Sequence, residues 1–90
     1  MTSPTAAGTS VGGMVMSSPG RSLAMARVSI TDGAGFNRSA LTNSFGYYRF
    51  DDVPAGATYV VSVAAKRYTF TPRAVNVLDE LTGINFVADQ

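Results

Sequence analysis

Residues 43–63, NSFGYYRFDDVPAGATYVVSV, constrain most strongly what this chain can fold into. The first half of the stretch alternates, with Tyr48 and Phe50 on one face, and alternation resumes in the second half from Tyr59 onward. Between the halves lies Pro-Ala-Gly at 54–56, where proline presets φ and glycine accepts a left-handed corner. The stretch therefore predicts two strands joined by a tight turn at the centre of an all-β fold.

The rest of the chain repeats this pattern of short strands and turns. Alternation predicts strands over 11–17, 25–31, 36–42 and 74–78, a short extended piece at 68–70, and a last strand through 84–86. The Asp-Gly-Ala-Gly cluster at 32–35 predicts a hairpin between its neighbours. No segment has a useful helical period, so we expect an antiparallel sandwich of seven strands. The expected core consists of Val15, Leu23, Ala26, Val28, Ile30, Tyr48, Phe50, Val53, Tyr59, Val61, Val63, Val75, Val77, Ile84 and Phe86.

Composition excludes several classes of chemistry. The chain has 90 residues, enough for one small domain, and contains neither cysteine nor histidine. Disulfides, thiolate or imidazole metal sites, and Cys or His nucleophiles are therefore excluded. A net charge of +1 provides no electrostatic footprint for nucleic acid, and no apolar run approaches the roughly 20 residues that span a bilayer. We expect no nucleic-acid partner and no membrane insertion.

The first ten residues have the composition of a linker. After Met1 they are only Thr, Ser, Pro, Ala and Gly, without the charged start and apolar centre of a signal peptide. We expect residues 1–10 to form an arm that is either flexible or added as a strand to a sheet edge, in its own molecule or in a neighbour. We interpret Met1 as an added start residue and residues 11–88 as one folded module of a larger parent chain.

Three blocks of the sequence carry a family resemblance: GRSLAMARVSITD at 20–32, ALTNSFGYYRFDDVPAG at 40–56 and TYVVSVAAKRYTF at 58–70. They resemble the carboxypeptidase regulatory-like domain, and the likeness extends over about residues 11–88. It implies a prealbumin-like (transthyretin-like), immunoglobulin-like β-sandwich, related to the B-type repeats of collagen adhesins. The matching positions are turn and core positions: Gly20, Leu23, Ala26, Val28, Ile30, Asp32, Thr42, Asn43, Gly46, Tyr48, Phe50, Val53, Pro54, Ala55, Gly56, Tyr59, Val61 and Val63.

The sequence departs from the adhesin repeats at one position of chemical importance. Those repeats often form an isopeptide bond between a lysine on the first strand and an asparagine on the last. Here Lys66 is the only lysine and lies outside the first strand, which leaves Asn85 without that partner. We expect no isopeptide bond.

The titratable residues suggest little chemistry. Asp51 and Asp52 form a carboxylate pair that would suit calcium or acid–base work, but we favour residues that end a strand and cap the following turn. We interpret Asp32 and the Asp79-Glu80 pair as turn residues in the same way. The serines have no histidine to activate them, and Lys66 stands beside Arg67 at a strand end. We therefore expect no enzyme, no catalytic residues, no bound metal and no cofactor.

Methionine and arginine are the residues that bear on a binding surface. By strand alternation Met14 and Met16 point away from the core, and Met25 precedes a core alanine on the second strand. Three such side chains on adjacent strands predict an exposed apolar patch and hence an interface, unless the register differs or the N-terminal arm covers them. The arginines fall mostly at outward positions, which we interpret as solubility, with a polar face for a glycan or a neighbouring domain as the alternative: Arg27, Arg38, Arg49, Arg67 and Arg73.

These observations support three hypotheses of function. The first is a non-catalytic structural or spacer module of a bacterial cell-surface or secreted protein, whose partners are neighbouring domains of its parent chain. The second is a self-assembling subunit of an extracellular fibre or oligomer, joined to copies of itself through its arm and its methionines. The third is a carbohydrate- or protein-binding accessory domain. Outward aromatic residues are few (Tyr47, Phe45 and Phe36), which makes a stacking platform for sugar weak.

Overall fold

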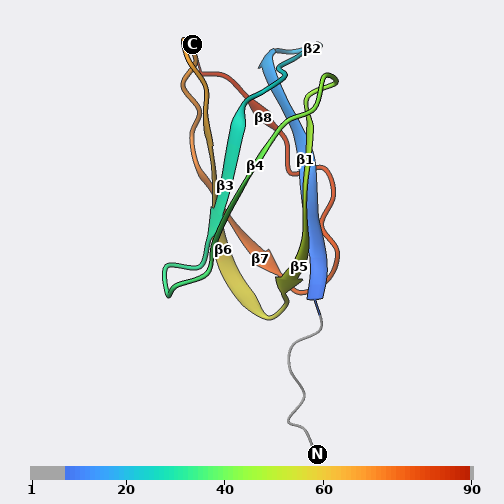
Figure 1. Ribbon diagram of the computed structural model, residues 1–90, viewed down its shortest axis with the longest axis vertical. Helices are drawn as coiled ribbons and strands as arrows, with labels where there is room; N and C mark the ends of the chain where they lie inside the picture. The colour runs from blue at the N-terminus through green and yellow to red at the C-terminus, as the bar shows by residue number, and fades with distance from the viewer. Residues whose placement is uncertain (1–7, 90) are drawn as a thin grey trace, which may run out of the picture.

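The computed structural model describes residues 8–89, and within them the chain forms two β-sheets packed face to face (Figure 1). This part of the chain contains no helix, and so none that could cross a membrane. The all-β sandwich is confirmed, but with eight strands rather than seven, because the two-residue β2 adds to the end of β1. The strands are β1 (Gly8–Ser18), β2 (Arg21–Ser22), β3 (Arg27–Thr31), β4 (Asn37–Leu41), β5 (Tyr47–Pro54), β6 (Ala57–Ala64), β7 (Arg73–Val77) and β8 (Phe86–Val87).

The first sheet is built around β1, which has neighbours on both sides. One edge of β1 pairs antiparallel with β5 over its first half and with β2 near its end. The other edge exchanges backbone hydrogen bonds with Leu81 and Ile84 and then pairs with β8. The β1–β8 pairing is parallel, in contrast to the antiparallel arrangement of the other strand pairs in residues 8–89. The N-terminal strand is therefore an interior strand of its sheet.

The second sheet has the order β4-β3-β6-β7. The predicted hairpin over 32–35 is confirmed, since β3 and β4 pair antiparallel and the Asp32 carboxylate accepts hydrogen bonds from the backbone N–H groups of Ala34 and Phe36. The reversal at 54–56 is also present, but it carries the chain from the first sheet to the second. The Tyr59 hydroxyl donates to the Pro54 carbonyl at 2.5 Å and fixes this corner. β5 and β6 therefore face each other across the core.

The core agrees closely with the alternation of the sequence. Every expected core residue is buried except Leu23 and Val63, which are partly buried, and Val11 is an additional fully buried residue. At the centre, the ring of Tyr48 packs against Phe50 and Phe86, with centroid separations of 5.9 and 6.5 Å. Interdigitated side chains from both sheets thus hold the sandwich together by apolar burial.

The structure moves some predicted strand boundaries. β1 begins at Gly8, so residues 8–10 of the predicted arm are paired strand, and residues 1–7 lie outside the described residues. β5 does not end at Asp51 but continues to Pro54 through a bulge, where Asp52 has a φ of 56°. Met25 is not on a strand: it lies in the turn before β3 with a φ of 62°. The extended piece at 68–70 forms only an isolated bridge, between Tyr68 and Ala65.

Two arginines connect the sheets along the open sides of the sandwich. Arg38 on β4 donates to the backbone carbonyls of Asp51 and Asp52 at the β5 bulge, and its guanidinium lies 5.1 Å from the ring centroid of Phe36. On the other side, Arg73 of β7 donates to the Asn85 carbonyl at 3.0 Å. Both side chains donate hydrogen bonds to backbone carbonyls at the edges of the sheets. Arg38 and Arg73 therefore have a structural role in addition to the solubility role that the sequence suggested.

Candidate functional site

The outer face of the first sheet is hollowed above Gly12. In the antiparallel pairing of β1 and β5, Gly12 stands opposite Arg49, and Met14 stands opposite Tyr47. Gly12 contributes no side chain to this face, and a depression of about 600 Å³ lies there between β1, β5, the end of β4 and residues 80–85. We call it the Gly12 trough and define it by Gly12, Met14, Asn43, Tyr47, Arg49, Glu80 and Asn85.

One wall of the trough exists because the chain after β7 lies unusually close to β1. Gly12 donates its backbone N–H to the Leu81 carbonyl at 2.9 Å and accepts from the Ile84 N–H at 3.1 Å. A Cβ atom on Gly13 would lie 1.9 Å from the Ile84 carbonyl oxygen, well inside any allowed contact. The glycine pair at 12–13 therefore both opens the trough and lets its wall approach.

Two asparagine side chains are held in place around the trough. The Asn43 amide oxygen accepts from the backbone N–H groups of Phe45 and Tyr47 at 2.9 and 3.0 Å. The Asn85 amide oxygen accepts from the Met14 N–H at 2.9 Å. Both oxygens are occupied by backbone, whereas neither amide NH₂ group has a protein acceptor among residues 8–89. Each side chain therefore presents a fixed pair of donors.

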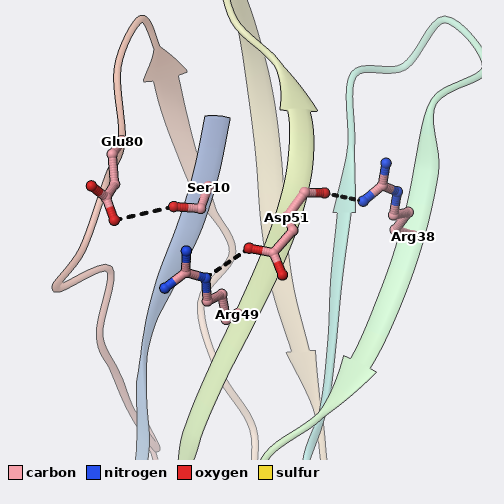
Figure 2. Close-up of polar contacts among 5 residues, drawn as sticks. All are labelled: Ser10, Arg38, Arg49, Asp51 and Glu80. Carbon is pink, nitrogen blue, oxygen red and sulfur yellow. Dashed lines mark hydrogen bonds and ion pairs between the residues drawn. The ribbon is translucent and has the colours of Figure 1, made fainter. Parts of the chain in front are cut away.

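Polar and charged side chains continue from this face to the open side of the sandwich beside β5 (Figure 2). From the loop after β7 to β4, Glu80 accepts from the Ser10 hydroxyl at 3.2 Å, Arg49 pairs with Asp51 at 2.7 Å, and Arg38 reaches the Asp51 backbone. The hydrogen bond and charge of Asp51 raise the pKa of the Arg49 guanidinium. A second, more polar depression of about 400 Å³ shares Ser10, Arg49 and Glu80 with the trough, so the two hollows adjoin each other.

The predicted interface methionines have different surroundings. Met14 is half-buried and lines the trough opposite Tyr47, and Met16 is half-buried two residues further along β1, where it pairs with Ser22 and Val87. Met25 is 70% exposed in its turn. The structure brings Met14 and Met16 to one strand, with Met25 in the turn before β3. Their use as an interface stays a prediction.

The carboxylate pair has a structural role different from the expected one. Asp51 and Asp52 lie within β5, and the Asp51 carboxylate binds Arg49 rather than capping the turn at 54–56. Within residues 8–89, no three His, Cys, Asp or Glu side chains gather in a way that would hold a metal ion. The bulge instead presents two carbonyls to Arg38.

Sequence reasoning missed the trough itself. Alternation places Tyr47 outward, and the side chain is indeed 53% exposed, with Phe45 in the preceding turn at 70%. Phe36 is instead partly buried, edge-on to Tyr59 at 5.4 Å. The one signal that pointed to the trough is the glycine pair at 12–13 within an alternating strand, since glycine in a strand often marks the close approach of another backbone.

Comparison with known proteins shows that most of the chain matches a known domain family. A family model described as the carboxypeptidase regulatory-like domain matches residues 10–88. Among curated proteins, no match to the chain is found.

Proposed function

Because the chain belongs to the carboxypeptidase regulatory-like domain family, a non-catalytic β-sandwich module, we propose that it works as a spacer that holds other domains apart. The observation that carries this proposal is the path of the chain. β1 begins at one end of the long axis of the sandwich, and the chain leaves β8 towards the opposite end (Figure 1). Domains joined before and after the module are then separated by the length of the strands.

The bonding of the terminal strands supports the same role. β1 is an interior strand, and β8 is paired to it, so both connections leave from elements fixed in the first sheet. Such a module transmits orientation as well as distance, which a linker of Gly and Ser does not. We place it in a bacterial cell-surface or secreted protein, where its partners are neighbouring domains of the parent chain.

A distance measurement tests the spacer function. One, two and three tandem copies are placed between two fluorescent proteins, and the separation is measured by small-angle scattering and energy transfer. A spacer increases the separation by an equal step with each copy. A flexible Gly/Ser linker of matched length is the control, because its end-to-end distance grows only as the square root of its length. If the separation of the fluorescent proteins grows only as the square root of the number of modules, the spacer proposal is wrong.

Met25 favours self-assembly as a second candidate function. A non-glycine residue in the left-handed region costs about 1–2 kcal/mol, and a side chain that is 70% exposed recovers little by burial. Fold stability therefore does not account for methionine here, whereas contact with a second copy would. Sedimentation velocity at rising concentration tests this candidate, with Met25→Ser and a chain lacking residues 1–7 as variants. A monomer at every concentration argues against assembly.

A further inference from the structure

Four polar side chains of the Gly12 trough are held in place by one of their polar atoms and have other polar atoms left to bind a ligand. Asn43 and Asn85 each bind backbone through the amide oxygen and present the NH₂ group. Arg49 binds Asp51 through Nε, which leaves its two terminal nitrogens, and one Glu80 oxygen takes the Ser10 hydroxyl. Four side chains are thus oriented by the protein while keeping donors or acceptors for a ligand.

The charge of the trough selects a neutral ligand. Its lining contains one cation, Arg49, which is already paired with Asp51, and one carboxylate, Glu80, so the trough has no excess of positive charge and only a single further carboxylate. A phosphate or an acidic chain would meet no excess positive charge, and a cation would meet no cluster of carboxylates. The remaining lining combines amides and hydroxyls with apolar groups, among them the exposed ring of Tyr47. This mixture fits a molecule with hydroxyls along its edges and C–H groups on its faces.

The floor strand of the trough argues against one common alternative, a peptide that adds to β1 as a further strand. A peptide that adds to a sheet needs an unpaired strand edge. The floor strand β1 has both edges occupied, by β5 on one side and by residues 81–88 on the other. A ligand that lies over β1 is therefore bound through side chains and not by addition to β1 as a further strand.

We propose that the Gly12 trough binds a neutral oligosaccharide. The ring of Tyr47 stacks on the C–H face of a pyranose, Asn43 and Asn85 donate to its hydroxyls, and Arg49 and Glu80 bind the next unit towards the second depression. The site goes beyond the spacer function and does not depend on it, because its lining residues take no part in the Val15–Phe86 and Met16–Val87 pairs that join the two terminal strands.

A titration with defined sugars tests the proposal. Amide chemical shifts of the whole chain are followed while neutral hexasaccharides of α-1,4-glucose, β-1,4-glucose, β-1,4-xylose and β-1,4-mannose are added up to about 10 mM, enough to detect millimolar binding. Binding of at least one sugar should shift amides of β1, β5 and residues 80–85. Tyr47→Ala should weaken that binding about tenfold, and Asn85→Asp, which keeps the acceptor oxygen but removes the donor, should also weaken it.

Phe45→Ala is the matched control. Phe45 is a still more exposed aromatic residue two positions away, and it does not line the trough, so its loss should leave the affinity within about twofold. If no neutral sugar shifts these amides, or if Phe45→Ala weakens binding as much as Tyr47→Ala, the proposal is wrong. Shifts produced only by polygalacturonate or by short peptides would likewise overturn it, in favour of an anionic or a protein partner.

Discussion

Substitution of Gly13 by alanine tests the close approach on which the first sheet depends. The added Cβ would meet three backbone atoms of Ile84: the carbonyl oxygen at 1.9 Å, the carbonyl carbon at 2.4 Å and the nitrogen at 2.9 Å. Ordinary contact begins at 3.4 Å, so the segment around Ile84 must move by about 1.5 Å. No side-chain rotation relieves the clash, because every atom concerned is backbone.

The magnitude follows from what this movement breaks. The Ile84 N–H donates to Gly12 at 3.1 Å, and the Ile84 carbonyl accepts from the buried Tyr48 hydroxyl at 2.6 Å. Each lost hydrogen bond costs about 1 kcal/mol, and partial exposure of the Ile84 side chain adds about 1–2 kcal/mol. We expect Gly13→Ala to lose about 3–4 kcal/mol of unfolding free energy. In a domain of this size that lowers Tm by about 15–25 °C.

Urea unfolding followed by circular dichroism measures the change, and Gly20→Ala is the control. Gly20 has a φ of +83°, but no atom lies within 4 Å of its added Cβ, so it loses only the conformational cost of about 1–2 kcal/mol. The comparison separates steric contact from backbone strain. If Gly13→Ala is no more destabilising than Gly20→Ala, the close approach of the Ile84 segment to β1 is refuted.

Three further predictions concern single side chains. Arg38→Met should lower the unfolding free energy by about 1 kcal/mol, because it removes the hydrogen bonds from the guanidinium to the β5 carbonyls. Arg27→Met on the neighbouring strand should be nearly neutral, and equal losses in urea unfolding would contradict the bridging role of Arg38. Met25→Gly should raise the unfolding free energy by about 0.5 kcal/mol, because glycine removes the cost of the left-handed conformation, and this cost exceeds the entropic stabilisation of the unfolded chain by glycine. A lower unfolding free energy would show that Met25 is not strained. Burial raises the pKa of Tyr48 above its usual value near 10. As the pH rises, the Tyr48 hydroxyl therefore loses its proton more readily in the unfolded chain than in the folded one, and the unfolding free energy should fall between about pH 9 and about pH 11. Unfolding free energies across this range should fall less steeply for Tyr48→Phe, and parallel curves would count against the assignment to Tyr48.

The fold was predictable where burial has a period of two. Tyr48 and Phe50, and then Tyr59 and Val61, alternate with polar or exposed neighbours because each strand buries only one face. The same period does not distinguish strands that pair from strands that face each other across a core. The sequence pattern therefore could not predict that β5 and β6 lie in opposite sheets. The two-residue β2 is too short to show any period.

The candidate site was only partly predictable. Alternation correctly directs Met14 and Tyr47 outward, but their opposition across two strands depends on register, which local pattern does not determine. Asn85 reaches the Met14 backbone across 71 positions of sequence. Arg38 and Arg73 look like solvated residues in the sequence, because the carbonyls they bind lie 14 and 12 positions further along the chain, in segments that alternation does not place beside them.

The parallel pairing of β1 with β8 has a mechanical consequence. When the chain is pulled from its two ends, β1 is drawn towards one end of the sandwich and β8 towards the other, along the common direction of the two strands. The contacts at Val15–Phe86 and Met16–Val87, together with the longer β1–β5 ladder, then carry the load in shear and must break at the same time. A strand pulled from a hairpin would open one bond after another. The first sheet is thus arranged to bear tension along its strands, because its terminal contacts are loaded together rather than one after another.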